Sequence, residues 1–205
     1  MLLSRMIANN YSVDAVIRHI TRLSQIHRIV ATDGYEAACD YVEHCLNDYG
    51  LDVERVRFEA RNGVDFLGYK SIQKWIIRAA RLEIIYPGEK KLSEFGLEPV
   101  LADFSVDPLS VVQMSAPTHG EIECEIIPIE KCYDMDRYDE RVRGNIVLVR
   151  GEADKVRAIA VERFGALGIV TDKTESSSLR KDPELRDART YQSFWWFGKE
   201  KKTFG

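Results

Sequence analysis

The sequence Val142-Arg-Gly-Asn-Ile-Val-Leu-Val-Arg-Gly151 decides the fold of the second half of the chain. Its aliphatic residues 146–149 follow one another without a polar residue, a pattern typical of a strand that is covered on both faces. Helical spacing follows over 153–164, and a second apolar run, 169–171, comes after the return Gly165-Ala-Leu-Gly168. This order predicts two strands joined by a crossover helix.

The turn after the first of these strands could in principle hold a phosphate group. It reads Arg150-Gly-Glu-Ala-Asp154, with one glycine and two acidic residues. A dinucleotide site needs G-x-G-x-x-G here, and the acidic side chains would repel a pyrophosphate. The sequence therefore disfavours nucleotide binding, and we interpret Gly144 and Gly151 as the turn residues that flank a core strand.

Bulk composition narrows the class of protein further. The chain has 205 residues, of which 45% are hydrophobic and 30% charged, with a net charge of −4. This acidic balance predicts no nucleic-acid partner. No apolar run approaches the roughly 20 residues that span a bilayer, and the first ten residues do not form a signal peptide. We expect a cytoplasmic protein with no membrane partner.

The first 60 residues read as helix, helix, strand. Ser12 is a good N-cap for an amphipathic helix, and Thr32 or Asp33 can cap a second one that ends near Gly50. Residues 51–58 then alternate in the manner of a strand. We place the domain boundary near residue 60, which gives an N-terminal helical segment and a β-rich domain.

Glycine and proline punctuate short apolar runs over residues 61–120, which predicts strands joined by turns. Residues 122–126 then alternate apolar and acidic side chains, as a half-buried strand does, and Pro128 places that strand at an edge or end. Candidate strands in the preceding region are 75–80, 81–86 and 110–114.

Side chains that carry chemistry are few and scattered. The nearest approach to a metal-binding motif is His119-Gly-Glu121, and no second ligand cluster accompanies it. The serines 176–178 lie in a polar run without a neighbouring histidine. None of the four cysteines forms a C-x-x-C pair. The sequence does not decide whether Cys124 and Cys132 form a disulfide. The sequence therefore predicts no catalytic residue and no metal ligand.

Aromatic residues are concentrated in Phe194-Trp-Trp-Phe197. Such a run fits either hydrophobic strand packing or an interaction surface, because aromatic side chains contribute strongly to both. If it is a surface, Trp195 and Trp196 are the interaction residues that we expect.

Three segments together resemble the protease-associated domain. They are GEIECEIIPI, VRGNIVLVRG and FGALGIVTD, and they occur in the order and spacing of that domain over roughly residues 115–172. The family's usual strand is written GKIVLVxRG and its return GAxGVI. Asn145 stands where the family has lysine, whereas Arg150 and Gly151 keep the exit from the strand.

The N-terminal stretch HRIVATDGYEAACDYVEHCLNDYGLDVE resembles the opening of the co-catalytic zinc aminopeptidases. That family includes glutamate carboxypeptidase and the transferrin receptor, and often carries a protease-associated domain just after this opening. Ala31 departs from the family's glycine. The residues that match its pattern are Arg28, Thr32, Gly34, Ala38, Tyr41, Val42, Gly50 and Val53.

This resemblance implies an α+β fold, with N-terminal helices over 1–60 and a barrel- or sandwich-like protease-associated domain with flanking helices over 61–205. The family's zinc ligands lie after that domain, and the chain contains no H-x-D motif. We therefore expect no cofactor in this chain, with zinc only in a full-length peptidase, and no activity of the chain alone. Its role would be to shape substrate access or oligomer contacts.

Two other functions stay open at this point. The chain could be a stand-alone binding module for a peptide or protein, or an independent enzyme, which would need a cleft of convergent titratable groups. The partners we expect are a peptide or protein, the missing peptidase domain, or a second copy of the chain.

Overall fold

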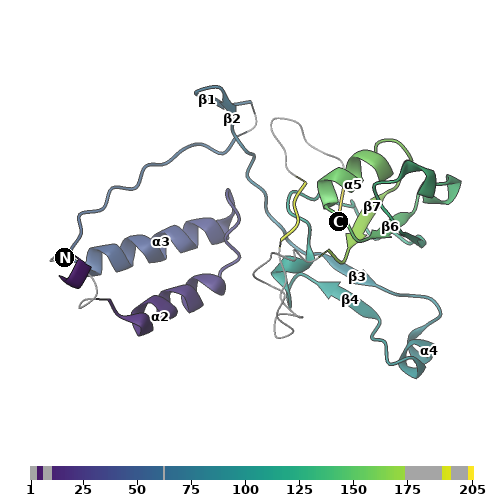
Figure 1. Ribbon diagram of the computed structural model, residues 1–205, viewed down its shortest axis with the longest axis horizontal. Helices are drawn as coiled ribbons and strands as arrows, with labels where there is room; N and C mark the ends of the chain where they lie inside the picture. Colours follow the sequence, from purple (N-terminus) through teal and green to yellow (C-terminus); the bar gives the residue numbers. More distant parts are fainter. Residues whose placement is uncertain (1–3, 7–10, 62, 174–190, 195–202) are drawn as a thin grey trace. The chain divides into compact units, whose positions relative to one another are not determined.

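A computed structural model describes residues 4–6, 11–61, 63–173, 191–194 and 203–205 (Figure 1). The chain divides into two compact units, Met1–Ile76 and Ile77–Gly205, which we describe separately. Both helices and strands are present, so the expected α+β class is confirmed. None of the helices in the described ranges is long and apolar enough to cross a membrane.

The first unit contains an antiparallel pair of helices (Figure 1). Helix α2, Val13–Ser24, begins where Ser12 accepts a hydrogen bond from the Ala15 N–H through its side chain, and Asp14 lies in its first turn. Helix α3, Asp33–Asp48, begins in the same way, with Thr32 as its N-cap. These caps satisfy N–H groups that a helix leaves without an internal partner, as the sequence predicts.

Residues 51–58 do not form the predicted strand. This prediction was wrong because alternation describes side chains only, whereas a strand also needs a neighbouring backbone to pair with. Salt bridges hold the segment to α3 instead. The Arg55 guanidinium lies 2.7 Å from Asp40 Oδ1 and 2.8 Å from Glu43 Oε2.

Two pairs of short antiparallel strands lie in the middle of the chain. Strands β1, Asp65–Phe66, and β2, Tyr69–Lys70, pair in the first unit, and β3, Arg81–Glu83, pairs with β4, Val100–Asp103, in the second. Helix α4, Glu89–Glu94, lies between β3 and β4. Of the candidate strands, 81–86 is confirmed in part, 75–80 is not a strand, and 110–114 makes only an isolated bridge at Gln113.

A three-stranded parallel sheet forms the centre of the second unit, in the order β5-β6-β7. Its strands are β5, Ile126–Ile129, β6, Ile146–Val149, and β7, Gly168–Thr171, and helix α5, Ala153–Ala160, connects the last two. The predicted strand–helix–strand unit is therefore confirmed, and Pro128 does lie in an edge strand. Pairing in β5 starts later than the alternation of residues 122–126 suggests.

The two faces of this sheet are not equally covered. Val147 and Ile169 are fully buried on the face that packs on α5, where they meet Val156 and Ala160 in the core. Leu148, on the opposite face, is 38% exposed. The expectation that β6 is covered on both faces was therefore wrong at its carboxyl end, because α5 covers one face only.

The last described residues close the amino end of the exposed sheet face. Phe204 forms a parallel bridge with Gly168, and a side chain at Gly168 would collide with the Phe204 ring. Phe194 is fully buried in the core, and its N–H donates to the Gln113 carbonyl. Phe194, the first residue of the aromatic run, therefore packs in the hydrophobic core. The described strands form three separate sheets and no closed barrel.

Candidate functional site

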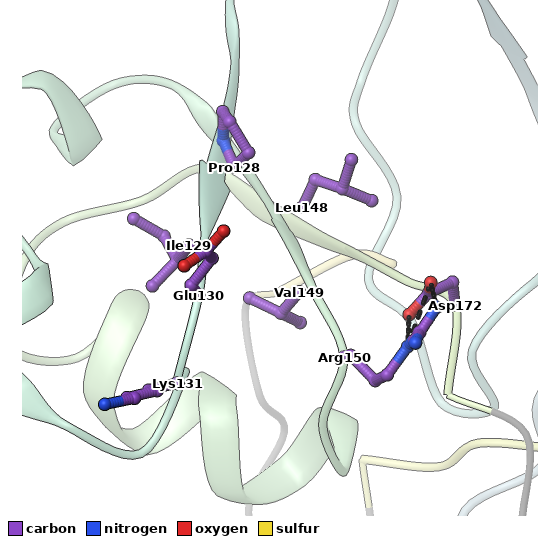
Figure 2. Close-up of a pocket in the computed structure, with 8 residues that line it drawn as sticks. All are labelled: Pro128, Ile129, Glu130, Lys131, Leu148, Val149, Arg150 and Asp172. Carbon is purple, nitrogen blue, oxygen red and sulfur yellow. Dashed lines mark hydrogen bonds and ion pairs between the residues drawn. The ribbon is translucent and has the colours of Figure 1, made fainter.

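A pocket of about 360 Å³ opens at the carboxyl ends of the parallel strands (Figure 2). Continuing the register of the sheet places Glu130, Arg150 and Asp172 side by side, directly after the last paired residues of β5, β6 and β7. Ligands of open parallel sheets bind at this edge, and the volume falls in the range of about 300–1,000 Å³ of ligand pockets. We therefore take this pocket as the candidate site.

Apolar side chains form the floor of the pocket. Pro128 and Leu148 are paired in register on the sheet face that α5 leaves uncovered. Figure 2 shows Pro128 and Leu148 above both Glu130 and the Arg150–Asp172 pair, with the Lys131 side chain extending away from them. The pocket thus combines an apolar surface with a charged rim.

The pair of Arg150 and Asp172 dominates the electrostatics of the rim. Arg150 Nε lies 3.1 Å from Asp172 Oδ1, and Nη2 lies 2.5 Å from Oδ2. These hydrogen bonds hold the pKa of the Asp172 carboxyl below its usual value and raise the pKa of Arg150. Because the side chains are 81% and 50% exposed, water screens the pair, and it contributes little to stability.

Glu130 differs from its neighbours in the row. Its side chain is exposed, and no salt bridge or side-chain hydrogen bond reaches its carboxylate from any part of the chain that the structure describes. The hydrogen bonds between Arg150 and Asp172 use Nε and Nη2 of the guanidinium, not Nη1. An unpaired carboxylate and a guanidinium edge therefore both face solvent at the carboxyl end of the apolar floor.

Buried groups behind the rim fix the loops that carry it. The Cys132 thiol donates to the Arg150 carbonyl at 3.5 Å, and the Tyr138 hydroxyl donates to the Cys132 carbonyl at 2.6 Å. Burial raises the pKa of Cys132 and raises the pKa of Tyr138 to about 12. Both groups stay protonated at neutral pH, so they support the loop rather than act as a nucleophile or base.

Asp172→Asn should have a small effect at neutral pH and a visible effect in acid. The lowered pKa of Asp172 means that its contribution is present above the unfolded-state pKa and is lost as pH falls through the folded-state pKa. We expect the variant to lose less than about 1 kcal/mol at pH 7 and to show a shallower loss of stability below about pH 4. Urea unfolding at pH 7 and pH 3 measures both.

Asp136→Asn is the matched control, because Asp136 is exposed and its carboxylate makes no ion pair with a described residue. It should leave the acid slope unchanged. An Asp172→Asn protein with the parent's acid slope would show that the Arg150 pair contributes nothing to stability.

The histidines do not converge on a metal site. His19 hydrogen-bonds the hydroxyls of Tyr41 and Tyr49, each at 2.7 Å, and His44 pairs with Asp48. His119 occupies an exposed turn with φ of 58°. Across the described ranges, no three His, Cys, Asp or Glu side chains are grouped to hold a metal ion, so these residues do not fit a co-catalytic zinc pair.

The remaining candidates from the sequence have different outcomes. Cys124 and Cys132 are both free thiols, so the disulfide that the sequence allowed between them is not formed. Trp195 and Trp196, together with the serines 176–178, lie outside the described residues. Their proposed roles stay predictions.

Sequence reasoning missed the charged row of Glu130, Arg150 and Asp172. A usable signal was present, since a charged residue directly follows each of the three apolar runs. Parallel strands bring those positions together at one edge. The register that aligns them depends on pairing between distant segments, which residue patterns alone did not supply.

Comparisons with known proteins give one partial similarity. The chain is 36% identical over 76 residues to Probable lipoprotein aminopeptidase LpqL of Mycobacterium tuberculosis, a match that covers 32% of this chain and 15% of that protein. No protein-family model matches the sequence, and no solved structure matches the chain. Over the matched segment, the chain is related to a protein named as an aminopeptidase.

Proposed function

We propose that this chain is a non-catalytic accessory portion of a zinc aminopeptidase-like protein. Its sheet-containing unit would be the protease-associated part that shapes substrate access, and its helical unit would meet the peptidase domain. The partial similarity to a protein named as an aminopeptidase supports this proposal. The motifs shared with the openings of zinc aminopeptidases and with the protease-associated domain are consistent with it.

The incomplete first unit is the observation that carries the proposal. Helix α2 has no buried residue, and its Val13, Ile17 and Ile20 are 61%, 53% and 58% exposed. These residues lie at helical spacing, so they form one apolar stripe without a cover in the described residues. Helices of this length depend on tertiary packing, and a stripe of this kind is typical of a surface that another element covers.

Residues 51–58 add to this argument. The segment has the side-chain alternation of a strand, and Val56 and Phe58 are 66% and 73% exposed. In the proposed whole protein, the helix pair and this segment would pack against a sheet that another domain supplies. The zinc ligands and the missing strands would both come from the peptidase domain.

A zinc-supplemented assay with an amino-acid p-nitroanilide tests the proposal. We expect no turnover by this chain and turnover by a longer protein that adds the sequence encoded downstream of Gly205. The reason is that a metal-activated water needs ligands that the described residues do not group together. Turnover by the chain alone at a rate comparable with the longer protein would refute the accessory role.

Two variants of the longer protein test whether helix α2 of the helical unit contacts the peptidase domain. Ile17→Glu places a charge in the exposed α2 stripe and should lower the melting temperature and the turnover, because the stripe would be covered by the peptidase domain. Arg18→Glu, its exposed neighbour outside the stripe, should change neither. Equal behaviour of the two variants would contradict a docked α2.

A stand-alone module that binds a peptide or protein is the alternative. The pocket at the carboxyl ends of β5, β6 and β7 favours it, because its lining comes entirely from the second unit. A stop codon shortly after Gly205 in the gene would favour this alternative over the accessory role.

A further inference from the structure

We propose that Cys45 is a reactive thiol, which His19 deprotonates through the Tyr41 hydroxyl and which exchanges with small disulfides. The site lies in the first unit, where helix α3 meets helix α2 (Figure 1). Neither the accessory role nor the pocket beside β6 uses these residues, so the inference goes beyond the proposed function.

The thiol belongs to a cluster of four side chains from the two helices. Tyr41, Cys45 and Tyr49 follow one another at intervals of four residues, which places them along one face of α3. His19 of α2 lies against this face, with Nδ1 2.7 Å from Tyr41 Oη and Nε2 2.7 Å from Tyr49 Oη. Cys45 Sγ lies 4.0 Å from Nδ1 and also hydrogen-bonds with Tyr41. A nucleophile, a base within reach and a group that orients the base are thus brought together.

This cluster can move a proton from the thiol to the imidazole without losing a hydrogen bond. In the starting state, the Cys45 thiol donates to Tyr41 Oη, the Tyr41 hydroxyl donates to His19 Nδ1, and Nε2–H donates to Tyr49 Oη. After the transfer, Nδ1–H donates to Tyr41 Oη, and the Tyr41 hydroxyl donates to the thiolate. The imidazolium and the thiolate then lie on either side of one hydroxyl, and their opposite charges stabilise the reactive form.

Tyr41 is suited to be the relay because it does not become the anion itself. Burial raises the pKa of Tyr41, and the hydrogen bond and charge of Cys45 raise it further. The other groups whose charges act on Tyr41 are Tyr49, which also raises its pKa, and Arg22, which lowers it. Tyr41 therefore keeps a proton at neutral pH, and the negative charge of the cluster rests on sulfur.

The exchange needs no oxidant other than the disulfide itself. The Cys45 thiolate attacks one sulfur of the disulfide, so that a new S–S bond forms to Cys45 while the original S–S bond breaks. The departing thiolate takes up the proton that the thiol gave to His19. One disulfide is consumed and one mixed disulfide is formed, so atoms and electrons balance.

The mixed disulfide would displace α2 from α3. Cys45 is partly buried, and its sulfur faces His19 of α2, so a group attached to sulfur enters the contact between the helices. Helix α2 has no buried residue, so its packing among the described residues is weak and offers little resistance. The modification therefore makes the helical unit sensitive to the redox state around it.

Reaction of the full chain with glutathione disulfide at pH 6 and at pH 9, followed by peptide mapping, tests the site. The readout is the rate at Cys45 at pH 6 divided by its rate at pH 9, because exposure of the thiol changes both rates alike. We expect this ratio to be about fivefold or more higher in the folded protein than in concentrated urea, since the ion pair favours the thiolate. His19→Gln and Tyr41→Phe should each lower it to the value in urea. Circular dichroism should show a loss of helix on modification, which dithiothreitol reverses.

His44→Gln is the matched control, because His44 precedes Cys45 on α3, is 74% exposed and pairs with Asp48. It should leave the ratio at Cys45 unchanged. Cys39, a second partly buried thiol of α3, should keep its own ratio in all three variants.

Three results would overturn the proposal. They are a folded ratio no higher than the ratio in urea, an equal fall for His44→Gln and His19→Gln, and a Tyr41→Phe protein that keeps the parent's ratio. Unchanged helix content after modification would overturn the displacement of α2. None of these measurements involves aminopeptidase turnover, so this proposal and the accessory role can fail separately.

Discussion

Phe194→Ala is expected to lower the free energy of unfolding of the second unit by about 3–5 kcal/mol. Phe194 is fully buried and is the largest of the completely buried side chains among the described residues. Its backbone is tied to Gln113 by the bond from the Phe194 N–H to the Gln113 carbonyl, at 3.0 Å. Removing the ring leaves a cavity that the anchored backbone cannot collapse to fill. Urea unfolding followed by intrinsic fluorescence and circular dichroism measures the loss.

Two further variants separate cavity formation from a general effect of losing an aromatic ring. Phe194→Leu keeps most of the apolar volume and should cost less than half as much as the alanine variant. Phe95→Ala removes a ring that is 68% exposed in the same unit and should stay within about 0.5 kcal/mol of the parent. A Phe194→Ala loss below about 1 kcal/mol would mean that Phe194 does not belong to the core.

Gly151→Ala is expected to cost about 2–3 kcal/mol, because the site has no room for a methyl group. A Cβ atom at Gly151 would lie 2.4 Å from Cys132 Sγ and 3.0 Å from Val156 Cγ2. Both neighbours are buried in the core, so neither can move away freely. Glycine here is required by a close approach behind the candidate site. Chemical denaturation gives the change in the free energy of unfolding.

A double-mutant cycle tests the stated cause. Cys132→Ala removes the sulfur atom that the new methyl group would meet, so the double variant should be more stable than the sum of the two single losses predicts, by about 1 kcal/mol or more. Cys124→Ala, at a partly buried thiol, is the control and should add to Gly151→Ala without coupling. Simple additivity with Cys132→Ala would contradict the proposed contact.

The predictions that succeeded from sequence were those in which local chemistry and side-chain period agree. Ser12 caps α2, and the uninterrupted run 146–149 is the central strand of the parallel sheet. Capping depends on residues three apart, and a covered strand is visible as an apolar run. Residues 51–58 show where this fails, because their alternation was correct but no strand pairs with them in the described residues.

The candidate site was harder to predict from the sequence than the fold. Glu130, Arg150 and Asp172 are separated by about 20 residues each, and the motifs that contain Arg150 and Asp172 do not show that these residues lie together with Glu130. Only the paired register of β5, β6 and β7 places them in one row. The exposure of Leu148 was missed for a related reason, since an apolar run does not reveal how far the covering elements extend.

The sequence by itself determined the strand–helix–strand unit, the α+β class and the capped N-terminal helices, because periodicity and capping act within a few residues. Only the tertiary structure decided which face of the sheet stays open, which carboxylate of the rim is unpaired, and why Gly151 is a glycine. These features arise from contacts between segments far apart in the chain, such as Gly151 against Cys132 and Arg150 against Asp172. Such contacts depend on strand register and side-chain packing. Both are set by the complete tertiary structure and cannot be read from a short stretch of sequence.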